Sequence, residues 1–140
     1  MRRQLQGLSR SATQGDVADG LYLVRVLRAH YRWHKQKPFY ELSFYVLEPQ
    51  PLFGCAITAR LSCASKSLWK FAWFLRDFRY SWELLEQDEI DIRALFGLQG
   101  VIQVWHEIAN GRSEVILKAF APAEDWPHLV SAPTADPEVA

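Results

Sequence analysis

The chain has 140 residues, of which 49% are hydrophobic and 14% aromatic. This length and composition suit one domain with its own core and leave little room for a second. The formal net charge is zero, which favours neither a general binder of polyanions nor an acidic solvating protein.

Several features indicate a cytoplasmic protein without a membrane partner. No apolar run approaches the roughly 18 residues of a membrane span, and the basic start is not followed by the apolar block of a secretory signal. Cys55 and Cys63 fall in one predicted strand, about 27 Å apart, whereas a disulfide needs Cα atoms within about 7 Å. We therefore expect reduced thiols, as is usual in the cytoplasm.

The composition divides the chain into three parts. Residues 1–19 and 129–140 are polar and without periodicity, which predicts a flexible arm and a flexible tail around a single domain at 20–128. Residues 1–40 hold eight Lys and Arg against two Asp, so the rest of the chain is acidic by the same margin. This asymmetry indicates either an anionic partner for the basic part or attraction between the two parts on folding.

Five segments show the apolar alternation of β-strands, namely residues 21–33, 39–48, 55–63, 101–108 and 114–120. In the first segment, the alternation places Leu27, Ala29, Tyr31 and Trp33 on one face and Arg28, His30, Arg32 and His34 on the other. Residues 35–38 are predicted to form the loop to the second strand. Asn110-Gly111 is a strong signal for a two-residue hairpin turn between the last two strands.

The period changes to that of a helix after the third strand. Ser65 is a candidate N-cap, with Ser67 as the alternative. The apolar stripe of this helix is predicted to contain Leu68, Phe71, Ala72, Leu75 and Phe78. A shorter helix is predicted at 88–96, and its first turn explains Asp88, Glu89 and Asp91 more simply than a metal cluster does.

The predicted order of elements is β-β-β-α-β-β, in a mainly β domain. This is the order of the OB-fold, a five-stranded, partly open barrel in which the helix between strands three and four covers one end. The alternative is another α+β arrangement, in which a three-strand meander and a hairpin pack on a helix.

Residues 30–40 mix cations with aromatic side chains, a combination that suits phosphates and stacked bases. In an OB-like barrel this segment and the loop at 109–112 lie on either side of the nucleic-acid groove. The predicted phosphate contacts are Arg28, Arg32, Lys35, Lys37, Arg60 and Arg112, and the predicted stacking residues are Trp33, Tyr45 and Trp105. The alternative for residues 30–40 is a twisted hairpin whose cations are solvated and whose Tyr31 and Trp33 belong to the core. The alternative for Trp105 is packing near Trp126.

Other chemistry finds no support in the sequence. His30 and His34 have the spacing of a zinc-binding helix, but they lie in a predicted strand and no Glu follows His30 in the zincin pattern. We find no glycine-rich phosphate loop, nucleophile elbow or catalytic Cys/His pairing. The protein is therefore expected to be no enzyme and to use neither a metal nor another cofactor.

The chain resembles, over about residues 20–122, a family of small uncharacterised proteins of phages and mobile elements that are regarded as single-stranded-DNA-binding. The resemblance is carried by Gly20-Leu21-Tyr22-Leu23-Val24, Tyr40-Glu41-Leu42-Ser43-Phe44-Tyr45-Val46 with Gly54, Ser67-Leu68-Trp69-Lys70-Phe71 and Leu98-Gln99-Gly100-Val101. It implies an accessory role in DNA replication or recombination.

Two hypotheses follow from the sequence. The first is a non-enzymatic protein that binds single-stranded DNA, with RNA as the other possible ligand. The second is a module of protein interaction or assembly that uses the aromatic helix around Trp69 and Trp73 and does not bind nucleic acid.

Overall fold

The computed structural model describes residues 3 and 17–130. Its strands are β1 (Gly20–His34), β2 (Lys37–Glu48), β3 (Ala56–Ser62), β4 (Gln99–Ala109) and β5 (Arg112–Pro122). Between β3 and β4 lie the helices α2 (Leu68–Asp77), α3 (Trp82–Glu86) and α4 (Ile92–Leu95). Short 3-10 helices occupy Gln50–Leu52, Ser65–Ser67 and Ala123–Asp125, and residues 126–130 are helical. The predicted mainly β class is confirmed.

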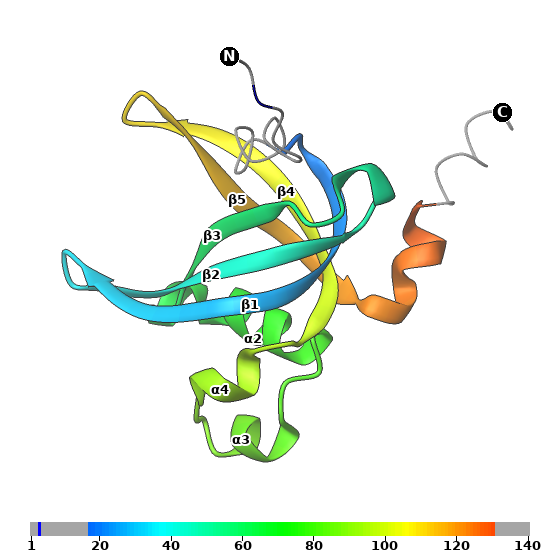
Figure 1. Cartoon of the computed structure of the whole chain (residues 1–140). Helices are drawn as coiled ribbons and strands as arrows, with labels where there is room; N and C mark the ends of the chain where they lie inside the picture. Colours follow the sequence, from blue (N-terminus) through cyan, green and yellow to red (C-terminus); the bar gives the residue numbers. More distant parts are fainter. Residues whose placement is uncertain (1–2, 4–16, 131–140) are drawn as a thin grey trace, which may run out of the picture.

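The five strands form one antiparallel sheet in the order β3-β2-β1-β4-β5. β1 pairs with β4 only over residues 20–25, and its second half continues with β2 as a long hairpin. The sheet curls strongly, so that the edge strands β3 and β5 approach each other (Figure 1). Within the described residues these edges are not hydrogen-bonded neighbours. The sheet is therefore curled and open and is not closed into a barrel.

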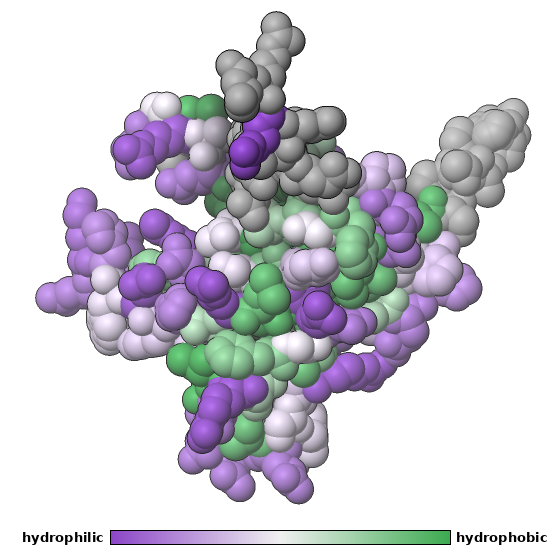
Figure 2. Space-filling model, viewed as in Figure 1, coloured by the Kyte–Doolittle hydropathy of each residue, from purple (hydrophilic) through white to green (hydrophobic). Residues whose placement is uncertain are grey.

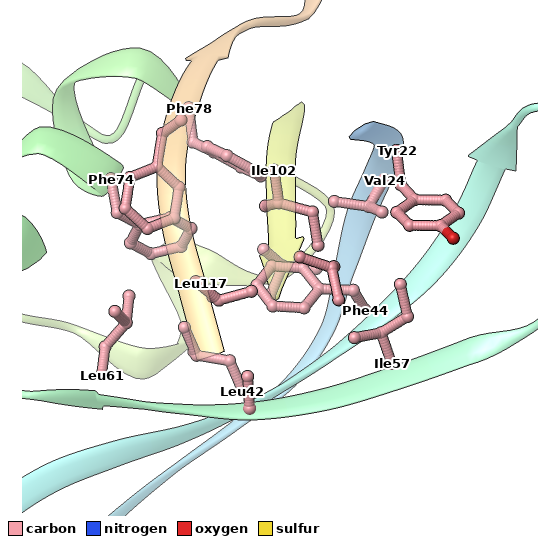
Figure 3. Close-up of a cluster of buried hydrophobic side chains, with 14 of the residues drawn as sticks. Tyr22, Val24, Leu42, Phe44, Ile57, Leu61, Phe74, Phe78, Ile102 and Leu117 are labelled. Atoms are coloured by element: carbon pink, nitrogen blue, oxygen red, sulfur yellow. The ribbon is translucent and has the colours of Figure 1, made fainter. Parts of the chain in front are cut away.

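The inner face of the curled sheet holds the core, and α2 covers one end of it. Figure 3 shows side chains from several strands meeting Phe74 of α2 and Phe78, which directly follows α2. Phe74 is fully buried, and its ring centroid lies 4.6 Å from that of Phe78 and 5.5 Å from that of Phe120. The predicted stripe was wrong in two respects, because Phe74 was omitted and Leu68 is 47% exposed. The buried face is centred on positions 71, 74, 75 and 78, which face the sheet.

A β-bulge in β1 changes which residues face the core. Val26 pairs with Phe44 and Arg28 pairs with Ser43, which leaves Leu27 as the extra residue. Val26 is therefore buried while Leu27 is 43% exposed, so the predicted face was wrong at Leu27. Beyond the bulge Ala29 is buried and Arg28 is exposed, as the alternation predicts.

Both long hairpins end in two-residue turns with left-handed backbone. Asn110 and Gly111 have φ values of 53° and 74°, which fits the predicted turn. Lys35 and Gln36 have φ values of 53° and 65°, and β2 already begins at Lys37. The predicted four-residue loop at 35–38 is therefore a tight turn, made by two residues that carry a Cβ and lose stability in this conformation.

Replacing Gln36 by Gly is expected to raise the free energy of unfolding by about 0.5–1 kcal/mol, because glycine adopts positive φ without steric cost. Urea unfolding followed by tryptophan fluorescence measures the change. Gln103→Gly in the interior of β4 is the control and should lower stability by a similar amount. A loss of stability in both variants would show that the left-handed turn does not limit this hairpin.

The predicted helix at 88–96 is wrong over its first four residues, because the chain there forms a turn before α4. The Asp91 carboxylate accepts a hydrogen bond from the Arg93 N–H at 3.0 Å, which caps α4. The Tyr80 hydroxyl donates to the Glu89 carbonyl at 3.0 Å and accepts from the Asp91 N–H at 2.9 Å. These bonds hold the turn in place, and of the three predicted first-turn acids only Asp91 caps a helix.

The ends of the domain differ in part from the prediction. Val17, which the sequence places in the arm, is only 6% exposed and belongs to the core. The rest of the predicted arm up to residue 16, apart from Arg3, and the predicted tail from 131 onward lie outside the described residues. Cys55 and Cys63 are free thiols. Among the described residues, no helix is both long enough and apolar enough to cross a membrane.

Candidate nucleic-acid interface

A groove of about 480 Å³ lies between the turn of the β1–β2 hairpin and the turn of the β4–β5 hairpin. Figure 2 shows hydrophilic residues over both hairpin ends, with a gap between them. We call this space the hairpin groove, and its lining residues are Arg32, Trp33, His34, Phe39, Arg60, Asn110, Arg112 and Glu114. The groove therefore joins residues from β1, β2, β3, the second hairpin turn and β5.

A smaller recess of about 190 Å³ extends this groove between the sheet edges β3 and β5. We call it the edge recess, and its lining residues are Glu41, Thr58, Ala59, Arg60, Glu114, Val115 and Ile116. Arg60 and Glu114 line both spaces. The open edges of the curled sheet therefore provide one continuous surface from the hairpin turns along β5.

Strand alternation explains why Arg32, His34 and Arg60 share the groove, whereas Trp33 has the opposite parity and contacts Tyr31. Past the bulge in β1, Arg32 and His34 point away from the core. Arg60 also points away from the core on β3, because its strand neighbours Ala59 and Leu61 are buried. Glu41 is opposite Arg60 in the β2–β3 ladder and therefore lies on the same face.

Two of the groove arginines are held by neighbouring side chains. The Arg32 Nε donates to the Glu41 Oε1 at 2.8 Å, and the Arg32 side chain remains 52% exposed. The Arg60 guanidinium carbon lies 5.0 Å from the centroid of the Phe39 ring. Such contacts limit the rotamers of long side chains while leaving N–H groups free to bind an anion.

The groove is not uniformly basic. Arg32, Arg60 and Arg112 face the carboxylates of Glu41 and Glu114, which line the same continuous surface. Glu114 is also directly opposite Glu107 in the β4–β5 ladder. The excess of positive charge in the groove is therefore small, and each carboxylate lowers the affinity for an anionic ligand.

The aromatic side chains of the hairpin are accessible. Trp33 is 61% exposed and Tyr31 is 44% exposed, and their ring centroids lie 6.1 Å apart in an edge-on contact. The alternative that places both residues in the core is therefore wrong. Trp33 lines the groove together with three arginines, so its exposed ring can accept a stacked base in a space that also offers phosphate contacts.

Of the nine residues predicted from the sequence, the hairpin groove brings together Arg32, Trp33, Arg60 and Arg112. The other five do not line this groove. Lys35 and Lys37 lie at the hairpin end and Arg28 is exposed further along β1. Tyr45 packs its ring 5.4 Å from Phe53 and 5.2 Å from the Arg25 guanidinium.

Trp105, the ninth predicted residue, is 44% exposed, and the Lys118 Nζ lies 5.6 Å from its ring centroid. The prediction also omitted four groove residues, namely His34, Phe39, Asn110 and Glu114. His34 and Phe39 lie on either side of the first turn, and their positions within the basic-aromatic segment at 30–40 could have identified them. No sequence signal distinguishes Glu114 from other exposed carboxylates, because its place depends on the pairing of β4 with β5.

A second pocket, of about 530 Å³, lies between the β1–β2 hairpin, α2 and the turn before α4. Most of its lining is apolar, including Tyr40, Phe71 and Leu75, whereas Asp88 and Glu89 are acidic. Burial raises the pKa of the Cys63 thiol and of the Tyr40 hydroxyl. Because its charged groups are carboxylates, this pocket does not suit a polyanion.

In the part of the chain that the structure describes, no three His, Cys, Asp or Glu side chains are grouped so that they could hold a metal ion. His30 and His34 lie four residues apart on one extended strand, which separates them by roughly 13 Å.

Comparison with models of protein families and with curated protein sequences finds no match to this chain.

Proposed function

We propose that this chain binds single-stranded nucleic acid in the hairpin groove and is not an enzyme. The observation that carries the proposal is the meeting of Arg32, Arg60 and Arg112 with the exposed Trp33 in one groove built from two hairpins. Guanidinium groups bind phosphates through several N–H donors, while an aromatic face stacks on any base. The expected binding therefore favours single strands and is indifferent to their sequence.

The arrangement of the sheet supports an OB-like interpretation of this groove. The strand order β3-β2-β1-β4-β5 with helices between β3 and β4 agrees with a five-stranded OB-like barrel left open between β3 and β5. In OB-folds the outer face of strands two and three, flanked by the loops after strands one and four, binds oligonucleotides. The hairpin groove lies beside the turns after β1 and β4, and this position supports the proposal. In this role the protein would act as an accessory of DNA replication or recombination.

Titration of fluorescein-labelled dT15 at about 50 and 200 mM NaCl tests the proposal. Three or four phosphate contacts on a single strand should raise the Kd about 20- to 50-fold over this interval, because each contact contributes roughly 0.7 to the slope of log K against log salt. A labelled 15-base-pair duplex is the control and should bind more weakly. The same titration with oligo-U decides between DNA and RNA. If dT15 does not bind at the lower salt concentration, the proposal is wrong.

Replacing Glu114 by Gln should tighten binding of dT15 about two- to fivefold, because the change removes a carboxylate that faces the groove arginines without altering the shape of the side chain. Fluorescence anisotropy at low salt measures the change, and Glu83→Gln on α3 is the control, with no expected effect. Weaker binding in Glu114→Gln would contradict this electrostatic account and indicate instead that the carboxylate accepts a hydrogen bond from a base N–H group.

The aromatic helix supports the second candidate function, a protein-interaction module. Trp69 is 63% exposed on α2 and stacks on Trp73 with ring centroids 6.3 Å apart. Large exposed aromatic side chains often mark a protein contact. Failure of dT15 to bind, together with elution of the protein as an oligomer, would favour this candidate.

A further inference from the structure

A second group of cations and aromatic rings lies outside the hairpin groove, on β4, β5 and α2. It consists of Trp105, Lys118, Lys70 and Trp69, and we call it the β5–α2 cluster. The Lys118 Nζ lies 5.6 Å from the Trp105 ring, and Trp69 stacks on Trp73 next to Lys70. Trp69 and Trp105 are 63% and 44% exposed. The cluster therefore has the same two kinds of side chain as the groove.

The cluster is continuous with the edge recess. Trp105 is directly opposite Ile116 in the β4–β5 ladder, so both side chains lie on the same face, and Ile116 lines the recess. Lys118 is the extra residue at the β-bulge between the Gln103 and Val104 pairs. Figure 1 shows β5 running from its hairpin toward the end of the sheet that α2 covers.

Lys70 and Lys118 interact unfavourably with each other. Burial and the neighbouring Lys118 lower the pKa of Lys70, and Glu107 only partly opposes this effect. Two ammonium groups that repel each other beside exposed tryptophans form a suitable place for a phosphate, because an anion relieves the repulsion. Two lysines and Glu107 together carry a formal charge of 2 − 1 = +1, so attraction for a phosphate remains.

We propose that a single strand bound in the hairpin groove continues along β5 to α2, where Lys118 and Lys70 contact phosphates and Trp69 stacks on a base. This inference rests on the proposed function. It extends the binding site beyond the two hairpins and makes the helix between β3 and β4 part of the interface.

The geometry sets the length of strand that is needed. From Arg112 to Lys118 the β5 backbone spans roughly 20 Å at about 3.4 Å per residue. Stacked nucleotides are also spaced by about 3.4 Å along one strand, so roughly six of them cover this distance. A pentanucleotide can therefore occupy the groove alone, whereas a strand of 15 nucleotides can reach both places.

Binding of labelled dT5 and dT15 to two variants, Trp69→Ala and Lys118→Gln, tests the inference. Each variant should weaken binding of dT15 about fivefold or more, because one stacked base or one phosphate contact is lost, and should leave dT5 unchanged. Lys118→Gln should also reduce the salt slope for dT15 by about 0.7. Trp82→Ala and Arg93→Gln remove an exposed Trp and an exposed Arg from α3 and α4, and both controls should bind like the parent protein.

The outcomes separate this inference from the proposed function. If the parent protein binds dT15 and neither variant changes its affinity, the path ends at the groove and the inference is wrong, while the proposed function stands. If the parent protein binds neither oligonucleotide, the proposed function itself fails. Trp69 and Lys118 are exposed, so both variants should fold, and unchanged thermal unfolding verifies this.

Discussion

Reversing the charge of Arg60 and Arg112 together, as Arg60→Glu with Arg112→Glu, is expected to weaken dT15 binding at least about a hundredfold. A hydrogen bond to a charged group contributes about 1.5–3 kcal/mol, so the loss of one such bond weakens binding by roughly one to two orders of magnitude. Two are lost here, and the new carboxylates repel the strand. The salt slope should fall by about 1.4, because two phosphate contacts disappear.

Arg93→Glu on α4 is the matched control. Its side chain is 88% exposed and lies 3.8 Å from Asp91, outside the groove lining. It changes the net charge of the protein by half as much as the double variant, so a purely global charge effect would weaken binding in both proteins. Equal, small losses in the two proteins would show that the groove has no special role. Arg60 and Arg112 are exposed, so the double variant should fold, with a thermal unfolding temperature lowered slightly by the new carboxylate opposite Glu41.

Alternation of apolar residues correctly predicted the inner faces of β2 and β3. Leu42, Phe44 and Ile57 are fully buried as this pattern requires, because a regular strand with one buried face leaves a direct mark on the sequence. A bulge leaves no such mark. Leu27 and Lys118 each occupy a position that the ladder skips, and a strict period of two assigns them or their neighbours to the wrong face.

The hairpin turns illustrate a second limit. Asn110-Gly111 is recognisable because both residues favour positive φ. Lys35-Gln36 adopts the same conformation without that preference, since the long pairing of β1 with β2 on either side holds it. Pattern alone therefore predicted a looser four-residue loop, whereas Lys35 and Gln36 form a tight turn and neither Lys35 nor Lys37 lines the hairpin groove.

Which residues line the groove depends on strand pairing and sheet curvature between segments that are far apart in the sequence. Basic-aromatic mixing identified Arg32 and Trp33, and the outward alternation of β3 identified Arg60. Glu41 and Glu114 come from different hairpins, and only the curl of the sheet brings their carboxylates to one surface. The sequence therefore indicated the attractive charges of the site but not the carboxylates that moderate them.

Phe74→Ala is expected to lower the free energy of unfolding by about 3–5 kcal/mol, the usual cost of removing a fully buried phenyl ring. The ring of Phe74 lies 4.6 Å from Phe78, 5.5 Å from Phe120 and 6.3 Å from Phe44, so it joins α2 to β2 and β5. The loss is a large part of the roughly 5–15 kcal/mol that stabilises a domain of this size. Urea unfolding followed by far-ultraviolet circular dichroism measures it.

The matched control is Phe96→Ala, whose ring is 48% exposed after α4 and which should cost at most about 1 kcal/mol. Equal losses in the two variants would show that α2 does not close the core. In the absence of urea Phe74→Ala should still bind dT5, which can occupy the groove alone, with nearly the parent affinity, because the arginines of the groove lie on β1, β3 and β5. A large loss of affinity without unfolding would mean instead that α2 determines how closely the edges β3 and β5 approach, so that packing of the helix sets the width of the binding groove.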